Sequence, residues 1–245
     1  MISLLPSEIR RQMGRKGSFF GSMVWCALFG AGVLIWVILS HKDTGFKAVD
    51  NGSGLLVFAV ALASIVVGAT AGAYDVDQGT MRYLVLTGRP RWQLVLVRIP
   101  ALVVTVVAFS LPAIVMILIA SVIAPGPGAS GSDYFDLFYG PWMTGLCYGI
   151  LSLTIGTFLK SNGVAIAVAV VLNFAGVLIA GLIQENVSQD LGNAFFAVVA
   201  GVVIQRHGDA GPPPTFSLTT SAVILGVWLV ALVAAAFVRV QRAEY

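Results

Sequence analysis

Few residues in this chain are of types that could do chemistry, and most of them lie outside its apolar stretches. His41 and His207 stand singly in polar segments, and Cys26 and Cys147 lie in apolar runs without the spacing of a metal site. The sequence has neither a His-Glu-x-x-His zinc motif nor a Gly-x-x-x-x-Gly-Lys-Ser/Thr phosphate loop. No serine in an apolar stretch has a histidine or lysine at the same depth to activate it. We therefore expect no catalytic site, no metal and no cofactor bound by this chain itself.

One polar segment, Asp75 to Arg98, interrupts the apolar pattern and carries arginines at positions 82, 89, 91 and 98. Its first half predicts a short helix capped by Thr80, because Met81, Leu84 and Val85 fall on one face at helical spacing. A turn at positions 88–90 then leads into a basic helix start. The predicted helix suits either a lipid surface or a contact with a cytoplasmic protein.

The elements around this segment are predicted to be membrane-spanning helices. The chain is 58% hydrophobic and 10% charged, whereas a soluble domain has about 25% charged residues. About 20 apolar residues cross the hydrocarbon core, and six stretches without Asp, Glu, Lys, Arg or His reach that length. They are Phe19–Leu39, Gly54–Tyr74, Ile99–Ala124, Tyr139–Leu159, Gly163–Ile183 and Leu218–Val238. We expect an all-α membrane protein with one transmembrane domain over residues 1–245, and a third span bent by Pro100 and Pro112.

The basic residues predict the orientation. Eleven lysines and arginines lie on the side that holds both termini, and three lie on the other side. The positive-inside rule then places both termini and the Asp75–Arg98 segment in the cytoplasm. The pattern has no long basic run with interleaved aromatics, so we expect no nucleic-acid partner.

The two segments outside the spans that carry apolar residues also predict helices. In residues 1–18, Ser7 is a candidate cap, and Leu5, Ile9 and Met13 share one face. Arg10, Arg11 and Arg15 lie away from that face, which favours a helix at the membrane surface; the alternative is a basic flank that orients the first span. In residues 184–217, the apolar part Ala194–Ile204 is too short to span and predicts an external amphipathic or re-entrant helix, with a partly ordered loop as the alternative. Its predicted apolar face holds Leu191, Phe195, Val198, Val199 and Val202.

Mild polar groups inside the predicted spans are candidates for lining a path. Those that we select, with one neighbouring aromatic, are Ser64, Thr70, Asn173 and Phe174. Such groups also serve as hydrogen bonds between helices, and both roles stay open for Asn173. Ion-coupled transporters commonly place ionisable residues at the midplane, and these spans have none, so we expect any transport to be energised elsewhere.

The polar segment resembles the first cytoplasmic loop of permeases of the type-2 ATP-binding-cassette transporter superfamily. That loop has acidic residues, Gly-Thr, a leucine-rich stretch, Pro-x-Ser-Arg with an aromatic, and a later cation. The matching residues here are Asp75, Asp77, Gly79, Thr80, Tyr83, Leu84, Val85, Leu86, Arg91, Trp92 and Arg98. Gly88 and Pro90 stand where the family usually has Pro and Ser. The order of a basic N-terminal helix, six spans and an apolar segment before the last span also matches.

The resemblance implies a membrane subunit of a bacterial exporter in the plasma membrane. It implies a coupling helix that contacts a separate ATPase, present in two copies, through Asp75, Asp77, Gly79, Thr80, Met81, Arg82, Tyr83, Leu84, Val85 and Arg91. ATP and Mg²⁺ would be bound by that ATPase, and a second permease copy, identical or related, would enclose a path for a hydrophobic or amphipathic substrate along spans one, two and five. Two other classes stay open: a non-transporting membrane anchor that docks a cytoplasmic partner, and an ion-coupled secondary transporter.

Overall fold

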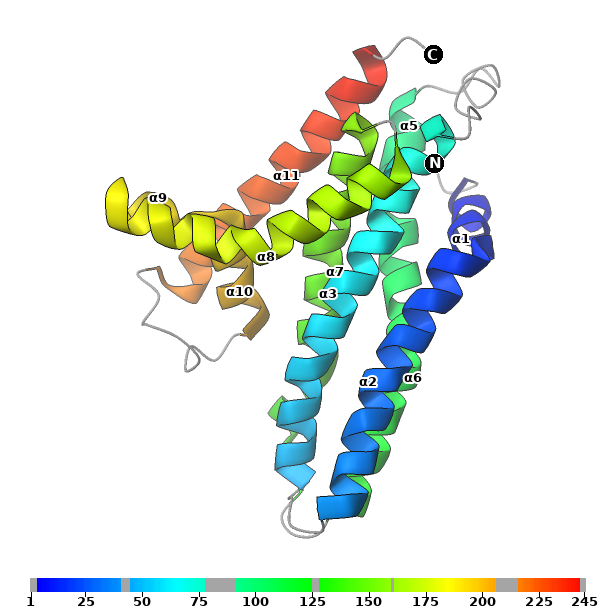
Figure 1. Ribbon diagram of the computed structural model, residues 1–245, viewed down its shortest axis with the longest axis vertical. Helices are drawn as coiled ribbons and strands as arrows, with labels where there is room; N and C mark the ends of the chain where they lie inside the picture. The colour runs from blue at the N-terminus through cyan, green and yellow to red at the C-terminus, as the bar shows by residue number, and fades with distance from the viewer. Residues whose placement is uncertain are drawn as a thin grey trace. The chain divides into compact units, whose positions relative to one another are not determined.

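The structure, a computed structural model, describes residues 4–40, 45–77, 91–124, 128–159, 161–205 and 216–242, and every regular element within them is a helix (Figure 1). The helices are α1 Leu5–Gly14, α2 Lys16–Ser40, α3 Gly45–Asp77, α5 Arg91–Leu96, α6 Arg98–Ile123, α7 Gly131–Phe158, α8 Asn162–Asn186, α9 Gln189–Asn193, α10 Phe196–Gln205 and α11 Leu218–Arg242. The prediction of an all-α fold is confirmed for these residues.

Five stretches of helix are long and apolar enough to cross a membrane: Lys16–Ser40, Gly45–Asp75, Gln93–Ile123, Asn162–Asn186 and Leu218–Arg242. By composition the chain is therefore a multi-pass helical membrane protein. The predicted fourth span lies in α7, which has 28 residues but is not among the five. Its first turns carry Asp133 and Asp136, and Pro141 lies inside the helix. The structure thus supports five spans, and a sixth remains a prediction.

Two helices begin at least two turns earlier than the apolar stretches indicated. Helix α3 begins at Gly45 instead of Gly54, and α7 begins at Gly131 instead of Tyr139. At α7 the reason is a capping box, in which the carboxylate of Asp133 accepts from the backbone N–H of Ser130 at 2.6 Å. The Ser130 hydroxyl in turn accepts from the backbone N–H of Asp133 at 3.4 Å. Polar side chains therefore extend α7 beyond the apolar residues that identify a span.

The chain divides into two compact units. The first unit holds Met1–Val67 and Leu96–Gly149, and the second unit holds Gly68–Val95 and Ile150–Tyr245.

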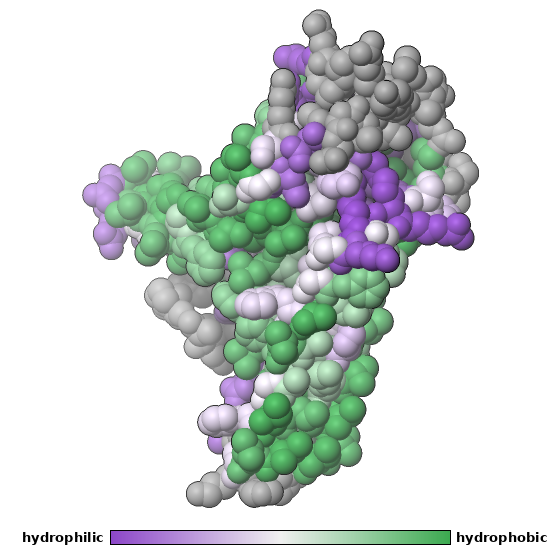
Figure 2. Space-filling model, turned by 45° about the vertical axis from the view of Figure 1, so that its right-hand side comes forward, coloured by the Kyte–Doolittle hydropathy of each residue, from purple (hydrophilic) through white to green (hydrophobic). Residues whose placement is uncertain are grey.

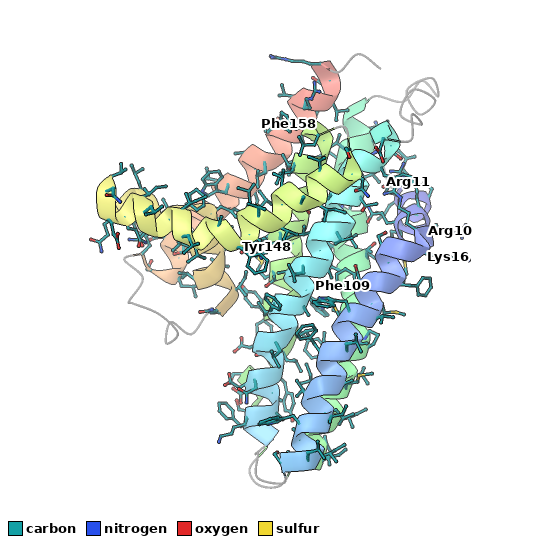
Figure 3. All side chains as sticks on the ribbon, viewed as in Figure 1. Arg10, Arg11, Lys16, Phe109, Tyr148 and Phe158 are labelled. Atoms are coloured by element: carbon teal, nitrogen blue, oxygen red, sulfur yellow. The ribbon has the colours of Figure 1, made fainter. Side chains whose placement is uncertain are left out.

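In the first unit, α2 and α6 pack together over most of their length with the first part of α3. At the closest approach, a Cβ added to Gly30 of α2 would lie 2.7 Å from the Cα of Ala113 on α6. Glycine is thus required at position 30, because a side chain there would push the two backbones apart. The fully buried Phe109 of α6 fills the core beside this contact (Figure 3).

The surface of the first unit changes character along α2. Hydrophilic residues gather around α1 and the start of α2, whereas the surface further along the unit is hydrophobic (Figure 2). Exposed apolar residues of α2 on this stretch include Leu28, Ile35 and Leu39. This distribution is typical of a helix that leaves the interface and enters lipid.

In the second unit, the end of α3 packs against the end of α7 through small residues. A Cβ at Gly156 of α7 would lie 2.6 Å from the carbonyl oxygen of Ala69, and one at Gly72 of α3 would overlap the carbonyl oxygen of Leu153. Ala69, Ala73 and Ala165 form a small buried cluster here. Helices in lipid associate in this way because small residues let their backbones come close.

The second unit also contains the segment for which we predicted a short apolar helix, and α10 confirms that helix. Its buried face agrees with the prediction at Val199 but differs elsewhere. Leu191 is 60% exposed, and the neighbouring residues Phe196 and Val203 are buried. The reason is a break between α9 and α10, which changes the phase of the helical pattern. The N–H of Trp228 on α11 donates to the carbonyl oxygen of Ala194 at 2.9 Å and holds this break in place.

Candidate functional site

The predicted coupling segment is only partly described. Gly79, Thr80, Met81, Arg82, Tyr83, Leu84 and Val85 lie outside the described residues, and so do the predicted turn and the side chains of Arg91 and Trp92. Asp75 and Asp77, at the end of α3, are described: Asp75 is buried and Asp77 is exposed. The predicted coupling helix therefore stays a prediction.

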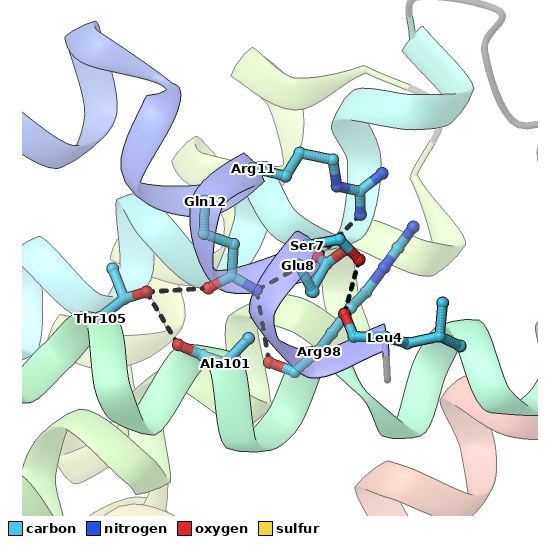
Figure 4. A network of polar contacts seen from close by, with 8 residues as sticks. All are labelled: Leu4, Ser7, Glu8, Arg11, Gln12, Arg98, Ala101 and Thr105. Carbon is cyan, nitrogen blue, oxygen red and sulfur yellow. Dashed lines mark hydrogen bonds and ion pairs between the residues drawn. The ribbon is translucent and has the colours of Figure 1, made fainter. Parts of the chain in front are cut away.

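The described residues at the basic end of the first unit form a polar junction between α1 and α6 (Figure 4). We call the residues Glu8, Arg11, Gln12, Arg98 and Thr105 the α1–α6 junction. Helix α1 begins after Leu4, with Pro6 in its first turn, where the missing N–H of proline costs nothing. The predicted cap at Ser7 is wrong, because the Ser7 hydroxyl donates to the Leu4 carbonyl at 2.7 Å from inside the first turn.

The face of α1 that is buried is polar. Glu8 and Gln12, one helical turn apart, are buried, whereas the predicted apolar residues Leu5, Ile9 and Met13 are each partly exposed. Of the predicted basic residues, Arg10 is exposed and Arg11 is half-buried, and both lie with Lys16 at the α1 end of the unit (Figure 3). Met13 packs against the core of the first unit, and polar contacts made by the buried face also attach α1 to the protein.

Gln12 is the centre of this attachment. Its Nε2 donates to the backbone carbonyl of Arg98 and to Glu8 Oε1, each at 3.4 Å. Its Oε1 accepts from the hydroxyl of Thr105 at 3.2 Å. Gln12 is 2% exposed, so these bonds form away from water, where leaving a partner unmet costs about 1–3 kcal/mol.

The acceptors fix the orientation of the Gln12 amide. Both atoms near its Nε2 are acceptors, so exchanging the amide oxygen and nitrogen would bring oxygen against oxygen. The Thr105 hydroxyl has one proton and two acceptors, Gln12 Oε1 and the carbonyl of Ala101 at 2.8 Å. If Gln12 is removed, the Thr105 hydroxyl can still donate to the carbonyl of Ala101. If Thr105 is removed, Gln12 Oε1 loses the hydroxyl that donates to it.

The carboxylate of Glu8 also binds Arg11, whose guanidinium donates to Glu8 Oε1 at 2.7 Å. The Arg11 side chain is 29% exposed, so this pair one turn along the helix contributes about 0.5 kcal/mol. Its main effect is to neutralise a carboxylate that α1 brings to its buried face. The sequence holds one signal for this junction, since Glu8 and Gln12 are four residues apart and share a face of α1. The prediction instead followed the apolar stripe of Leu5, Ile9 and Met13.

The structure places the predicted path residues in different surroundings. Ser64 belongs to the first unit and is fully buried, near enough to α7 that a Cβ at Gly145 would lie 3.1 Å from its Oγ. In the second unit, Thr70 is buried, Asn173 is half-buried and Phe174 is 55% exposed. The packing around Ser64 indicates a contact between helices at that position. Among the described residues, no three His, Cys, Asp or Glu side chains are grouped so that they could hold a metal ion.

Comparison with known proteins identifies the family. A comparison with curated proteins finds no match to the chain. A family model described as a protein of unknown function, DUF2705, matches residues 30–245, which run from the middle of α2 to the end of the chain. The matched region includes Arg98 and Thr105 of the α1–α6 junction but not α1. Because the match covers most of the chain, this protein belongs to the DUF2705 family, whose function is unknown.

Proposed function

We propose that this protein is the permease subunit of an ATP-binding-cassette exporter, driven by a separate cytoplasmic ATPase. The observation that carries the proposal is the bond between Gln12 and the backbone of Arg98. Arg98 is the first residue of α6, and the segment at positions 78–90 precedes α5 and α6 directly. A force applied to that segment would therefore reach α6 at the point where α1 is attached.

Charge placement supports an external energy source. The buried charged residues among those described are Glu8, Asp75 and Arg98. Each lies in α1 or within the first or last turn of a helix, so none is near the middle of an apolar stretch. A proton- or sodium-coupled carrier usually has an ionisable residue at that depth. Together with the resemblance of residues 75–98, this distribution favours coupling to ATP hydrolysis on a partner.

The remaining parts of the proposal concern topology and assembly. Helix α7 would be a sixth span, both termini would face the cytoplasm of a bacterial cell, and α10 would lie outside the plasma membrane. Two permease copies, identical or related, would associate with two ATPase copies that bind ATP and Mg²⁺. Spans one, two and five would line the path, with Asn173 and Phe174 of α8 as candidate contacts for a hydrophobic or amphipathic substrate.

The experiment is co-purification of the full chain with the ATPase encoded beside it, followed by ATP hydrolysis in proteoliposomes. We expect the paired replacement Arg82→Ala with Tyr83→Ala to abolish assembly or uncouple hydrolysis from transport. Arg10→Ala is the matched control, since Arg10 is an exposed cation of α1 outside the loop. Unchanged assembly and unchanged transport in the paired variant would show that the coupling role is wrong.

Two outcomes would instead support the other classes. A stable complex with a neighbouring protein that lacks ATPase activity would indicate a membrane anchor or regulatory module. Transport that survives vanadate and collapses with a protonophore would indicate an ion-coupled carrier. The measurement of ATP hydrolysis alongside transport separates these outcomes.

A further inference from the structure

A cavity of about 770 Å³ lies between the end of α2 and the start of α3, within the first unit and at the opposite end of α2 from α1. Small-molecule sites occupy about 300–1,000 Å³ and combine apolar walls with a few placed polar groups. This cavity has that composition. Its walls include Trp36 and Phe46, and its polar residues are Lys47, Asp50 and Asn51.

Helical spacing separates the apolar and polar parts of the cavity. On α2, Gly32 and Trp36 are four residues apart and share one face, over the buried Val33 and Val37. On α3, Lys47, Asp50 and Asn51 also share one face, and all three are exposed. No atom lies within 4 Å of a Cβ placed at Gly32, so the wall is open above that glycine.

The placement of the polar residues corresponds to a membrane interface. With 33 residues, α3 is about 50 Å long, whereas the hydrocarbon core is about 30 Å thick. The polar residues of the cavity fall in the first two turns of α3, before the long apolar part of the helix begins at Gly54. Trp36 is 63% exposed and Phe46 is 46% exposed, and aromatic rings are typical of this depth.

We propose that this cavity binds a zwitterionic phospholipid of the phosphatidylethanolamine type. The acyl chain would lie along the apolar wall at Gly32 and Trp36. The ammonium group would meet the carboxylate of Asp50 and the faces of Trp36 and Phe46, because carboxylates and aromatic faces both attract cations. The phosphate would meet Lys47. The site does not depend on the proposed transport function.

The charges explain why one headgroup class is preferred. A lysine and an aspartate three residues apart give the cavity no net charge, so an anionic lipid would gain from Lys47 and lose at Asp50. A zwitterion gains at both residues. Selection for phosphatidylethanolamine over phosphatidylglycerol with the same chains is therefore the property that distinguishes this site from general lipid contact.

The experiment measures quenching of tryptophan fluorescence in the detergent-solubilised full chain by phosphatidylethanolamine with brominated chains. We expect a saturable component that disappears in Trp36→Phe, since that ring reports on the cavity. Gly32→Leu fills the wall and should raise the half-saturating concentration at least about tenfold. Gly21→Leu is the matched control on the same helix, because Gly21 is exposed, has no atom near its Cβ and lies outside the cavity.

The charged residues give a second test that does not disturb packing. Asp50→Asn should weaken phosphatidylethanolamine about two- to fivefold and remove its advantage over phosphatidylglycerol. Lys47→Gln should weaken both lipids by a similar factor, because both carry phosphate. Equal, non-saturating quenching by the two lipids would overturn the proposal. It would also be overturned if Gly32→Leu eluted as a folded protein and bound phosphatidylethanolamine like Gly21→Leu.

Discussion

The helices within each of the two units pack by different kinds of contact. The first unit has a continuous core of aliphatic and aromatic side chains, reinforced by polar contacts such as the bond from Trp142 to Ser110 at 3.2 Å. The second unit relies on close contacts between glycine and alanine residues and leaves most of α8 and α11 exposed. Only 17% of the apolar window is buried in α8 and in α11, against 28% in α2 and 44% in Gln93–Ile123. The first unit is therefore stabilised mainly by itself, and the second depends on whatever covers α8 and α11.

The variant with the largest expected effect on stability is Gly156→Leu in the second unit. The new side chain would meet the backbone of α3 at Ala69 and Gly72, where nothing can move without separating the helices. We expect a loss of about 3 kcal/mol in the free energy of unfolding. Hydrogen–deuterium exchange in detergent should show α8 and α11 losing protection while α2 and α6 keep theirs.

Gly226→Leu on α11 is the control for this variant. Gly226 is exposed, and no atom lies within 4 Å of its Cβ, so its effect should stay within about 0.5 kcal/mol. If Gly156→Leu opened all helices together, the two units would not differ in stability, and the comparison would fail.

The next test concerns the α1–α6 junction of the first unit. Thr105→Val removes the donor to Gln12 Oε1 and leaves that buried oxygen without its partner, which should cost about 2 kcal/mol. Gln12→Leu should cost about 1 kcal/mol, because Thr105 keeps Ala101 and Glu8 keeps Arg11. The double variant should then be more stable than Thr105→Val alone. Chemical unfolding of the four proteins gives this double-mutant cycle, and strictly additive losses would contradict the network.

Much of the fold could be predicted from the sequence, because apolar length identifies spanning helices directly. All six predicted stretches lie in helices to within one residue at their ends, and α10 was predicted as a short apolar helix. The early start of α7 could have been predicted from Ser130 and Asp133, whose spacing is that of a capping box. The prediction placed the residues before Tyr139 outside the helix because they are polar, and so it missed this start.

The α1–α6 junction could not be predicted in the same way. Gln12 bonds Arg98 and Thr105, which lie 86 and 93 residues further along the chain. Helical spacing tells which residues share a face, but it does not tell which helix that face meets. The stripe of Leu5, Ile9 and Met13 indicated a helix in contact with lipid. In the structure the polar face of α1 lies toward α6 instead, where Gln12 donates to the buried carbonyl of Arg98. The role of residues 79–85 stays a prediction.

The smallest expected effects are those of replacing one tryptophan in each unit. Trp228→Phe removes the bond to the Ala194 carbonyl, and Trp142→Phe removes the bond to the Ser110 hydroxyl. Each should cost about 1 kcal/mol, since each loses one hydrogen bond and keeps an aromatic ring. The distribution of the loss should differ, because Trp142 packs against the core of the first unit whereas Trp228 holds the break between α9 and α10. Exchange should therefore rise locally in α10 for Trp228→Phe and stay unchanged in α6 and α7 for Trp142→Phe. A local rise in both variants would show that the first unit is held by its polar contacts and not by its core.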